Sequence, residues 1–306
     1  MTEEVRIIRF MRFRRGMAIF SAAMVLIGLV SLVTKGLNLG LDFTGGTSVE
    51  LRFQEPAHQA QISSALAGAG IEDAVVQYLG DAHSVQVRLP PQPGEATLVG
   101  NRIVDIVSTP DNRATVLQID SVGSQVGDEL YAQSLMAMGF AMLMMMAYIA
   151  VRYRWKFSVG AVVSLIHDVL FTLGVFSLFG WPFDLTVLAA VLALIGYSLN
   201  DTIVVFDRIR ENFRKLRRAD PVEIVDISLT ETLRRTIMTV LTVAVVVLAM
   251  LLVGGPALQW FSVALLVGLF AGTYSSIYVG TAYALAMGLS RDDFIIQVKK
   301  AEDELP

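Results

Sequence analysis

The sequence is dominated by long apolar runs separated by shorter polar segments. Apolar runs long enough to cross a membrane occupy residues 16–34, 130–151, 157–179, 185–206 and 236–290. A helix needs about 20 residues, at ~1.5 Å of rise each, to cross a hydrocarbon layer of roughly 30 Å. The last run contains no Asp, Glu, Lys or Arg and is divided by Gly254-Gly255-Pro256, a combination that ends one helix and begins another. The pattern therefore predicts six transmembrane helices.

The first apolar run follows a basic N-terminal arm, as the core of a secretory signal does. The run is long, however, and no small-residue cleavage site follows it in Lys35-Gly36-Leu37-Asn38. We therefore interpret residues 1–34 as a cytoplasmic arm and an uncleaved first membrane helix.

The segment between the first two runs, residues 35–129, has the texture of a soluble domain. Alternating stretches predict four strands, at residues 47–53, 74–79, 84–89 and 114–122. Two further stretches predict helices, at residues 57–70 and 95–108. Gly80-Asp81 is the expected turn of a hairpin between the middle strands. The order β-α-β-β-α-β favours a ferredoxin-like α+β domain.

The expected fold is thus an α-helical multi-pass membrane protein with a ferredoxin-like α+β domain outside the membrane. Helices two to six occupy residues 130–290, and residues 291–306 form a tail. A composition of 54% hydrophobic and 17% charged residues fits such alternation better than one soluble domain.

Lys and Arg residues fall on every second connection. The N-terminal arm, the links at 152–156 and 208–235 and the tail are basic, whereas the links at 180–184 and 254–259 have no Lys or Arg. Basic loops face the cytoplasm, so both termini are predicted there and residues 35–129 on the periplasmic side. The outer segment carries five basic and twelve acidic residues, which agrees with that orientation.

A carboxylate interrupts the third apolar run. An ionised side chain at the centre of a membrane helix costs roughly 2.5–3.5 kcal/mol on insertion scales, and persists mainly where pairing or function uses it. Asp168 is spaced by four residues from Ser164 and from Thr172, so the three share one helix face, with His167 beside them.

A second carboxylate, Asp201, lies seven residues, or ~10 Å of helix, from the basic end of the fourth run. On the fifth helix Arg235, Thr239 and Thr242 share one face. One hypothesis is that this face meets Asp201 in a protonatable switch, because burial favours the neutral acid and a nearby guanidinium favours the carboxylate. The alternative is that Arg234 and Arg235 are ordinary cytoplasmic flanks and that Asp201 makes only local contacts. Spacing alone leaves both open.

The sixth helix carries small residues at an unbroken interval of four. They are Gly268, Gly272, Ser276 and Gly280, continued by Ala284 and Gly288. Such a row allows close approach of another helix and favours a helix–helix contact. Whether that helix belongs to the same chain is open.

Several motifs together resemble the SecD/SecF family of protein-export membrane proteins, within the resistance-nodulation-division superfamily. They are LDFTGGT at residues 41–47, SVGSQVGDEL at 121–130, IGYSLNDTIVVFDR at 195–208, GGP at 254–256 and SSIYV at 275–279. The resemblance covers nearly the whole chain and is closest to the SecF branch, although LDFTGG alone also fits SecD. The length, with no second six-helix repeat, fits a separate SecF rather than a fused SecDF.

The resemblance implies a subunit of the SecDF complex in the bacterial cytoplasmic (inner) membrane that uses the proton motive force to aid protein translocation. It implies SecD as partner, the SecYEG translocon with SecA, an unfolded exported polypeptide as substrate, and YajC as a further partner. The family's proton-coupling residues fall on Asp201 and Arg235. Asn200 and Asp168 complete the predicted set, and Arg234 is a neighbouring alternative.

Other classes of function are disfavoured. The chain has no Cys and no HExxH sequence, so we predict no metal site, no cofactor other than protons as the coupling ion, and no enzymatic activity. Its net charge of −4 and scattered basic residues disfavour nucleic-acid binding. The main rival is a passive assembly subunit whose outer domain is a docking scaffold and whose buried charges hold the partner.

Overall fold

The computed structural model describes residues 7–71, 73–91, 95–153, 155–216, 218–290 and 293. Arg6, Arg154, Arg217 and the predicted tail, apart from Asp293, lie outside the described residues. Within the described ranges, six helices are long and apolar enough to cross a membrane, as predicted. They are α1 (Arg14–Thr34), α5 (Ser124–Arg152), α6 (Trp155–Phe179), α7 (Leu185–Lys215), α8 (Pro221–Val253) and a composite of α9 (Pro256–Ser275), the π-helical turn η2 (Ser276–Gly280) and α10 (Thr281–Ala286).

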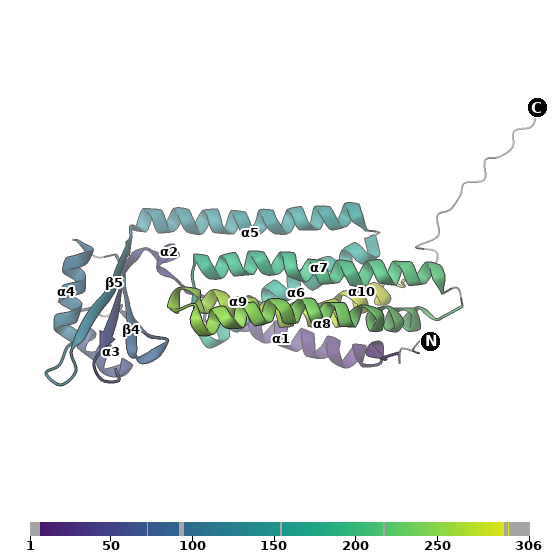
Figure 1. Cartoon of the computed structure of the whole chain (residues 1–306). Coiled ribbons are helices and arrows are strands. Elements are labelled where there is room, and N and C mark those ends of the chain that lie inside the picture. Colours follow the sequence, from purple (N-terminus) through teal and green to yellow (C-terminus); the bar gives the residue numbers. More distant parts are fainter. Residues whose placement is uncertain are drawn as a thin grey trace, which may run out of the picture.

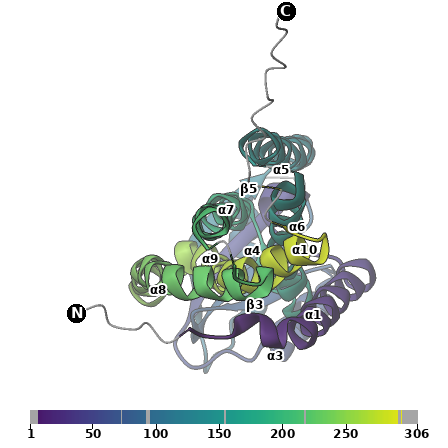
Figure 2. The ribbon, with the colours of Figure 1, turned by 90° about the vertical axis from the view of Figure 1, so that its right-hand side faces the viewer.

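The long helices form one elongated bundle with a small domain at one end (Figure 1). The short helix η1 (Phe10–Phe13) lies at the opposite end, just before α1. Viewed along the bundle, α1, α5 and α8 lie at the rim (Figure 2). In their most apolar stretches 17% of residues or fewer are buried, against 50–56% in α6, α7 and α9–α10. The inner three helices therefore form the core of the bundle.

The outer domain is a four-stranded antiparallel sheet with two helices on one face. Its elements are β2 (Gly46–Phe53), α3 (Gln59–Gly68), β3 (Val75–Leu79), β4 (Asp81–Leu89), α4 (Ala96–Val107) and β5 (Ala114–Val122). The strand order is β3-β4-β2-β5, with every pair antiparallel. The predicted order β-α-β-β-α-β is present. Strand β4 begins at Asp81, so Gly80 alone, with φ of 82°, makes the turn between β3 and β4.

Alternation along the strands builds the core of this domain. Val49 and Leu51 on β2 point to the same face as Val85 and Val87 on β4, and all four are fully buried. Leu66 of α3, also fully buried, packs in the same cluster. One face of the sheet is therefore covered by α3 and α4 and packs into an apolar core, and the other face carries no helix.

Two helices begin earlier than the apolar runs predicted. Helix α5 begins at Ser124, so the last residues of the predicted 35–129 domain belong to a membrane helix. Helix α8 begins at Pro221, with the Asp220 side chain accepting the Val222 N–H. Most of the predicted 208–235 link is therefore helical, because α7 also continues to Lys215. Charged residues are tolerated in these turns since they lie at the ends of the bundle.

A two-residue strand pair, which the sequence did not predict, joins the bundle to the domain. Strand β1 (Asn38–Leu39) runs parallel to β6 (Pro182–Phe183), which precedes α7. The Arg88 guanidinium of β4 donates to the Leu39 carbonyl at 2.9 Å and to Asn38 Oδ1 at 2.7 Å. Burial lowers the pKa of Arg88, and the Asp184 carboxylate nearby opposes that change. The link thus carries a half-buried cation that ties the domain to the start of α7.

Candidate functional site

Small side chains bring α9 into near-backbone contact with α7. A Cβ on Gly268 would lie 2.5 Å from Leu194 Cδ2, and one on Gly272 would lie 3.1 Å from Ser198 Cβ. One turn further on, Ser276 Oγ lies 3.0 Å from Thr202 Oγ1. The small-residue row therefore meets a helix of the same chain.

The end of the row touches two helices. The π-helical turn η2 inserts an extra residue into the helical repeat, and a Cβ on Gly280 would lie 3.4 Å both from the Gly160 carbonyl oxygen of α6 and from Phe206 Cζ of α7. A Cβ on Gly160 of α6 would lie 2.6 Å from the Gly280 carbonyl oxygen. The row therefore contacts α7 at Gly268, Gly272 and Ser276, and both α6 and α7 at Gly280.

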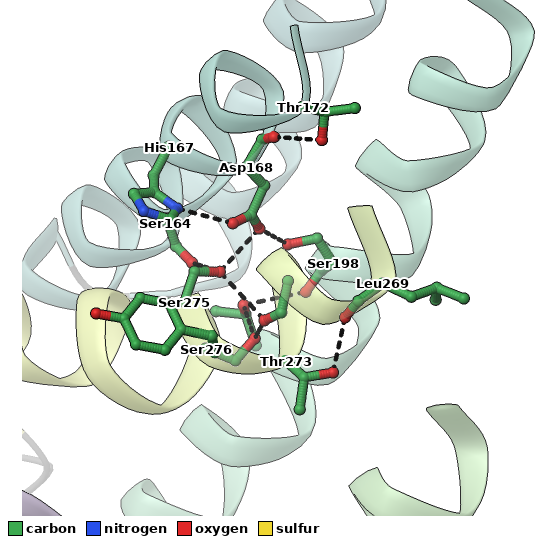
Figure 3. A network of polar contacts seen from close by, with 12 residues as sticks. Ser164, His167, Asp168, Thr172, Ser198, Leu269, Thr273, Ser275 and Ser276 are labelled. Atoms are coloured by element: carbon green, nitrogen blue, oxygen red, sulfur yellow. Dashed lines mark hydrogen bonds and ion pairs between the residues drawn. The ribbon is translucent and has the colours of Figure 1, made fainter. Parts of the chain in front are cut away.

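Asp168 lies where α6, α7 and α9 meet, and it is fully buried. Its Oδ2 accepts hydrogen bonds from Ser198 Oγ of α7 and from Ser275 Oγ of α9, the latter at 2.8 Å (Figure 3). Ser164 Oγ donates to Ser275 Oγ at 2.8 Å, which extends the network along α6. Thr172, the other member of the predicted stripe, donates instead to the Asp168 backbone carbonyl at 2.8 Å. One carboxylate thus ties three helices together.

His167 is the basic group of this network. Its Nδ1 lies 3.0 Å from Asp168 Oδ1, and its side chain is 7% exposed. The ring stacks on Phe171 and lies against Tyr274, whose hydroxyl donates to the Met17 carbonyl of α1 at 2.6 Å. His167 Nε2 is buried and has no hydrogen-bond partner among the described residues. The pair His167–Asp168 can therefore hold a proton between its facing atoms.

Asp201 occupies a different setting. It is 8% exposed, and with Ser198, Thr239 and Thr242 it lines a cavity of about 300 Å³ between α7, α8 and α9. Among the residues that the structure describes, its carboxylate makes no hydrogen bond or ion pair with another side chain. A cavity of this size, with polar groups in its wall, has room for water. Asp201 is accessible to a small ion or solvent from inside the bundle.

Arg235 lies fourteen residues after Pro221, or ~21 Å along α8, directly before the uncharged stretch of that helix. It lines a second cavity, of about 480 Å³, together with Asn200, Arg208 and Glu231. Arg235 acts on Asp201 electrostatically without a direct contact. Asn200 lines both cavities. Of the predicted set, Asp201, Asn200 and Arg235 thus line one or both cavities, whereas Asp168 lies in the buried network next to Ser198.

Two functional side chains, Ser198 and Ser275, were missed by sequence reasoning. Ser198 precedes Asp201 by three residues and so lies on the same helix face. Ser275 is adjacent to Ser276 of the small-residue row. Both serines look like ordinary small packing residues in sequence, and only the crossing of three helices brings their hydroxyls to Asp168.

Two of the sequence motifs meet at the junction with the outer domain. A Cβ on Gly45, whose φ is 65°, would lie 2.8 Å from Ser124 Cα, and one on Gly127 would lie 2.8 Å from the Gly45 nitrogen. Within α2 (Leu41–Thr44), Asp42 Oδ2 accepts the Leu185 N–H at 3.1 Å. The helix that carries Asp201 is therefore held at its first residue by the domain linker.

Comparison with known proteins places these features in a family. Residues 103–290 match the family "Protein export membrane protein SecD/SecF, C-terminal", and residues 30–57 match the "SecD/SecF GG Motif". Protein translocase subunit SecF of Pseudomonas aeruginosa is 45% identical and covers 100% of both chains. SecF of Escherichia coli O157:H7 is 42% identical over 96% of this chain and 92% of that protein.

Two solved structures are also similar. The crystal structure of SecDF, a translocon-associated membrane protein from Thermus, superposes with a TM-score of 0.85 at 35% identity, over 94% of this chain. SecDF in its super-membrane-facing form gives a TM-score of 0.66 at 36% identity, over 92% of this chain. In both cases this chain spans only 39% of the SecDF chain. The chain belongs to the SecD/SecF family of protein-export membrane proteins, and SecF subunits are its full-length relatives.

Proposed function

We propose that this chain is the SecF-type subunit of a bacterial SecDF complex and uses the proton motive force to aid protein translocation across the cytoplasmic membrane. Its relatives are named protein translocase subunits, and the solved SecDF chain is described as translocon-associated. We place SecD beside it as the partner that completes the complex, with SecYEG, SecA and YajC as neighbours. In this proposal the substrate is the unfolded exported polypeptide, and the subunit catalyses no covalent reaction.

The observation that carries the proposal is the setting of Asp201. A buried carboxylate without a direct partner is costly to keep ionised, yet this one lines an internal cavity large enough for water. Arg235 and Asn200 lie on the neighbouring cavity, which also contacts the charged end of α7. Protons would reach Asp201 through water in the two cavities, both of which Asn200 lines, and the Arg235 charge would favour their release.

Helix α7 connects this site to the outer domain. Its middle carries Asp201, and its first residue donates a hydrogen bond to Asp42 in the linker that leads into β2. A shift of α7 on protonation would therefore reach the domain through the β1–β6 pair and Arg88. The proton cycle in this mechanism moves the domain against the exported chain.

The strand order and the charge pattern support two finer assignments. The arrangement β3-β4-β2-β5, with two helices on one face, fits a ferredoxin-like split βαβ sandwich. The predicted basic links lie at the end of the bundle opposite this domain. The domain is then periplasmic, and both termini are cytoplasmic. These placements extend the same proposal within the resistance-nodulation-division superfamily.

Proton uptake into vesicles that contain the chain and its SecD partner tests the proposal. Asp201→Asn should reduce uptake to background, because an amide cannot exchange a proton at this site. The matched control is Asp105→Asn, which changes an exposed carboxylate on α4 of the outer domain and should leave uptake unchanged. Equal uptake by wild type and Asp201→Asn would favour the passive scaffold instead.

A further inference from the structure

The Asp168 network touches the Asp201 cavity at one residue. Ser198 contributes to the wall of that cavity, and its hydroxyl donates to Asp168 Oδ2. Asp201 follows Ser198 on the same face of α7. Ser198 therefore connects the cavity that contains Asp201, which is large enough for water, to the fully buried Asp168 carboxylate.

The negative charge of an ionised Asp168 can be balanced by one added proton. Titratable groups in the middle of the elements packed around it include His167 on α6, Tyr197 and Asp201 on α7, and Tyr274 and Tyr278 on the last helix. Of these, His167 alone among the described residues is within hydrogen-bond distance of Asp168. An ionised carboxylate without a positive partner is strongly disfavoured at full burial. One proton shared by His167 and Asp168 makes the pair neutral, whichever residue holds it.

We propose that His167 and Asp168 form a second proton-binding unit, connected in series with Asp201 through the Ser198 hydroxyl. The inference rests on the proton-driven function proposed above. A proton that arrives at Ser198 Oγ from the cavity forms a new O–H bond there, while the proton that Ser198 already carries passes to Asp168 Oδ2. The step begins with Asp168 ionised and His167 neutral, so the serine ends with the same number of protons and the pair gains the one proton that makes it neutral.

Protonation at Asp168 also changes what holds the three helices. An ionised carboxylate only accepts hydrogen bonds, whereas its protonated oxygen donates one. Ser198 and Ser275 then lose a shared acceptor, and Ser275 keeps the Gly272 carbonyl, at 3.1 Å, as an alternative. The tie between α6, α7 and α9 is therefore weakened in the protonated state, in the same helices that contact the Asp201 cavity.

Two measurements on the complex with SecD test the inference. Proton uptake into proteoliposomes should fall about tenfold or more in Asp168→Asn and several-fold in Ser198→Ala, and Ser198→Cys, which keeps a transferable proton, should recover part of the loss. Thr172→Val is the matched control, because its hydroxyl bonds only a backbone carbonyl, and uptake should match wild type. Infrared difference spectra across pH should show a protonated-carboxyl band that Asp168→Asn removes and Ser198→Ala shifts.

The outcomes separate this inference from the proposed function. Loss of uptake in Asp201→Asn combined with wild-type uptake in Asp168→Asn would overturn the series arrangement and leave the proposed function standing. Wild-type uptake in Asp201→Asn would overturn the proposed function, and the infrared band would still report whether Asp168 titrates. If Asp168→Asn does not assemble, Ser198→Ala tests the inference instead. Unchanged proton uptake and an unshifted carboxyl band in Ser198→Ala would contradict proton transfer through Ser198.

Discussion

In the outer domain, β2 and β4 bury Val49, Leu51, Val85 and Val87 completely, whereas at the same depth the helix bundle buries Asp168 and its serine partners. An apolar core is held by shape and by exclusion of water, so any internal sliding opens a cavity. Hydroxyl and carboxyl groups can exchange partners without opening one. The comparison predicts that the domain is rigid and that exchange of hydrogen-bond partners in the bundle costs less.

The glycine contacts strengthen the contrast. Gly160 and Gly280 let α6 and the last helix touch at backbone distance, and the π-helical turn between α9 and α10 lies at that contact. Such turns are frequent at functional sites in helices. No comparable irregularity interrupts α3 or α4 of the outer domain. The region expected to move is the one with small side chains and a broken helical repeat.

Leu51→Ala should have the largest effect and should be confined to the domain. Leu51 is fully buried in a dry core, so its truncation should cost about 2–5 kcal/mol. Hydrogen–deuterium exchange should rise across β2, β4 and β5 while the bundle helices stay protected. Leu98→Ala, on an exposed position of α4, is the control and should change little. Loss of protection in α6 or α7 would show that the two regions are not independent.

Gly160→Ala should destabilise the bundle by about 1–3 kcal/mol, because the new methyl group meets the Gly280 backbone, which cannot turn away. Gly268→Ala should cost less, since its nearest contacts are side-chain atoms of Leu194 rather than backbone. Gly196→Ala, where nothing lies within 4 Å, should be neutral or slightly stabilising. Thermal unfolding in nanodiscs ranks the three. An equal cost at all three positions would contradict backbone contact as the cause.

Asp42→Ala should cost about 1 kcal/mol, because it leaves the Leu185 N–H at the start of α7 without its acceptor. Exchange should rise at residues 183–188, and translocation should fall while proton uptake persists, since Asp201 is untouched. Asp105→Ala, on an exposed position of α4, controls for loss of negative charge. Unchanged translocation would mean that the domain receives motion by another route.

Features of the fold that depend on local pattern could be predicted from the sequence. The apolar runs determine the number of long helices, and period-two alternation placed β2 and β5 within a residue of their observed bounds. The start of α8 at Pro221 was missed because charged turns interrupt the apolar signal, although Asp220-Pro221 is a helix-start sequence. The π-helical turn could not be predicted, because the small residues keep their interval of four through Ser276–Gly280 although the helix winds differently there.

The candidate site was predictable only as a set of separate residues. Burial of charge in membrane helices identified Asp168 and Asp201, since few causes other than function keep them there. Their different settings depend on which hydroxyls the neighbouring helices bring, and Ser198 and Ser275 carry no such signal. The predicted meeting of Asp201 with Arg235 stays a prediction, because the two residues lie in adjoining cavities without direct contact.

The smallest change in stability is expected for Glu50→Gln, on the sheet of the outer domain. Partial burial first, and the Asp120 carboxylate second, raise the pKa of Glu50 above 4.5. Because the folded state then binds the proton more tightly than the unfolded one, stability is fully present below the unfolded pKa and is lost as pH rises through the folded pKa. Glu50→Gln should therefore stabilise the domain at neutral pH by less than about 1 kcal/mol, since the side chain is partly solvated. Exchange of β2 and β5, compared with wild type at each pH, measures the gain, which should vanish in acid. A stability gain of Glu50→Gln that does not change with pH would mean that the gain comes from packing and not from removing the charge of Glu50.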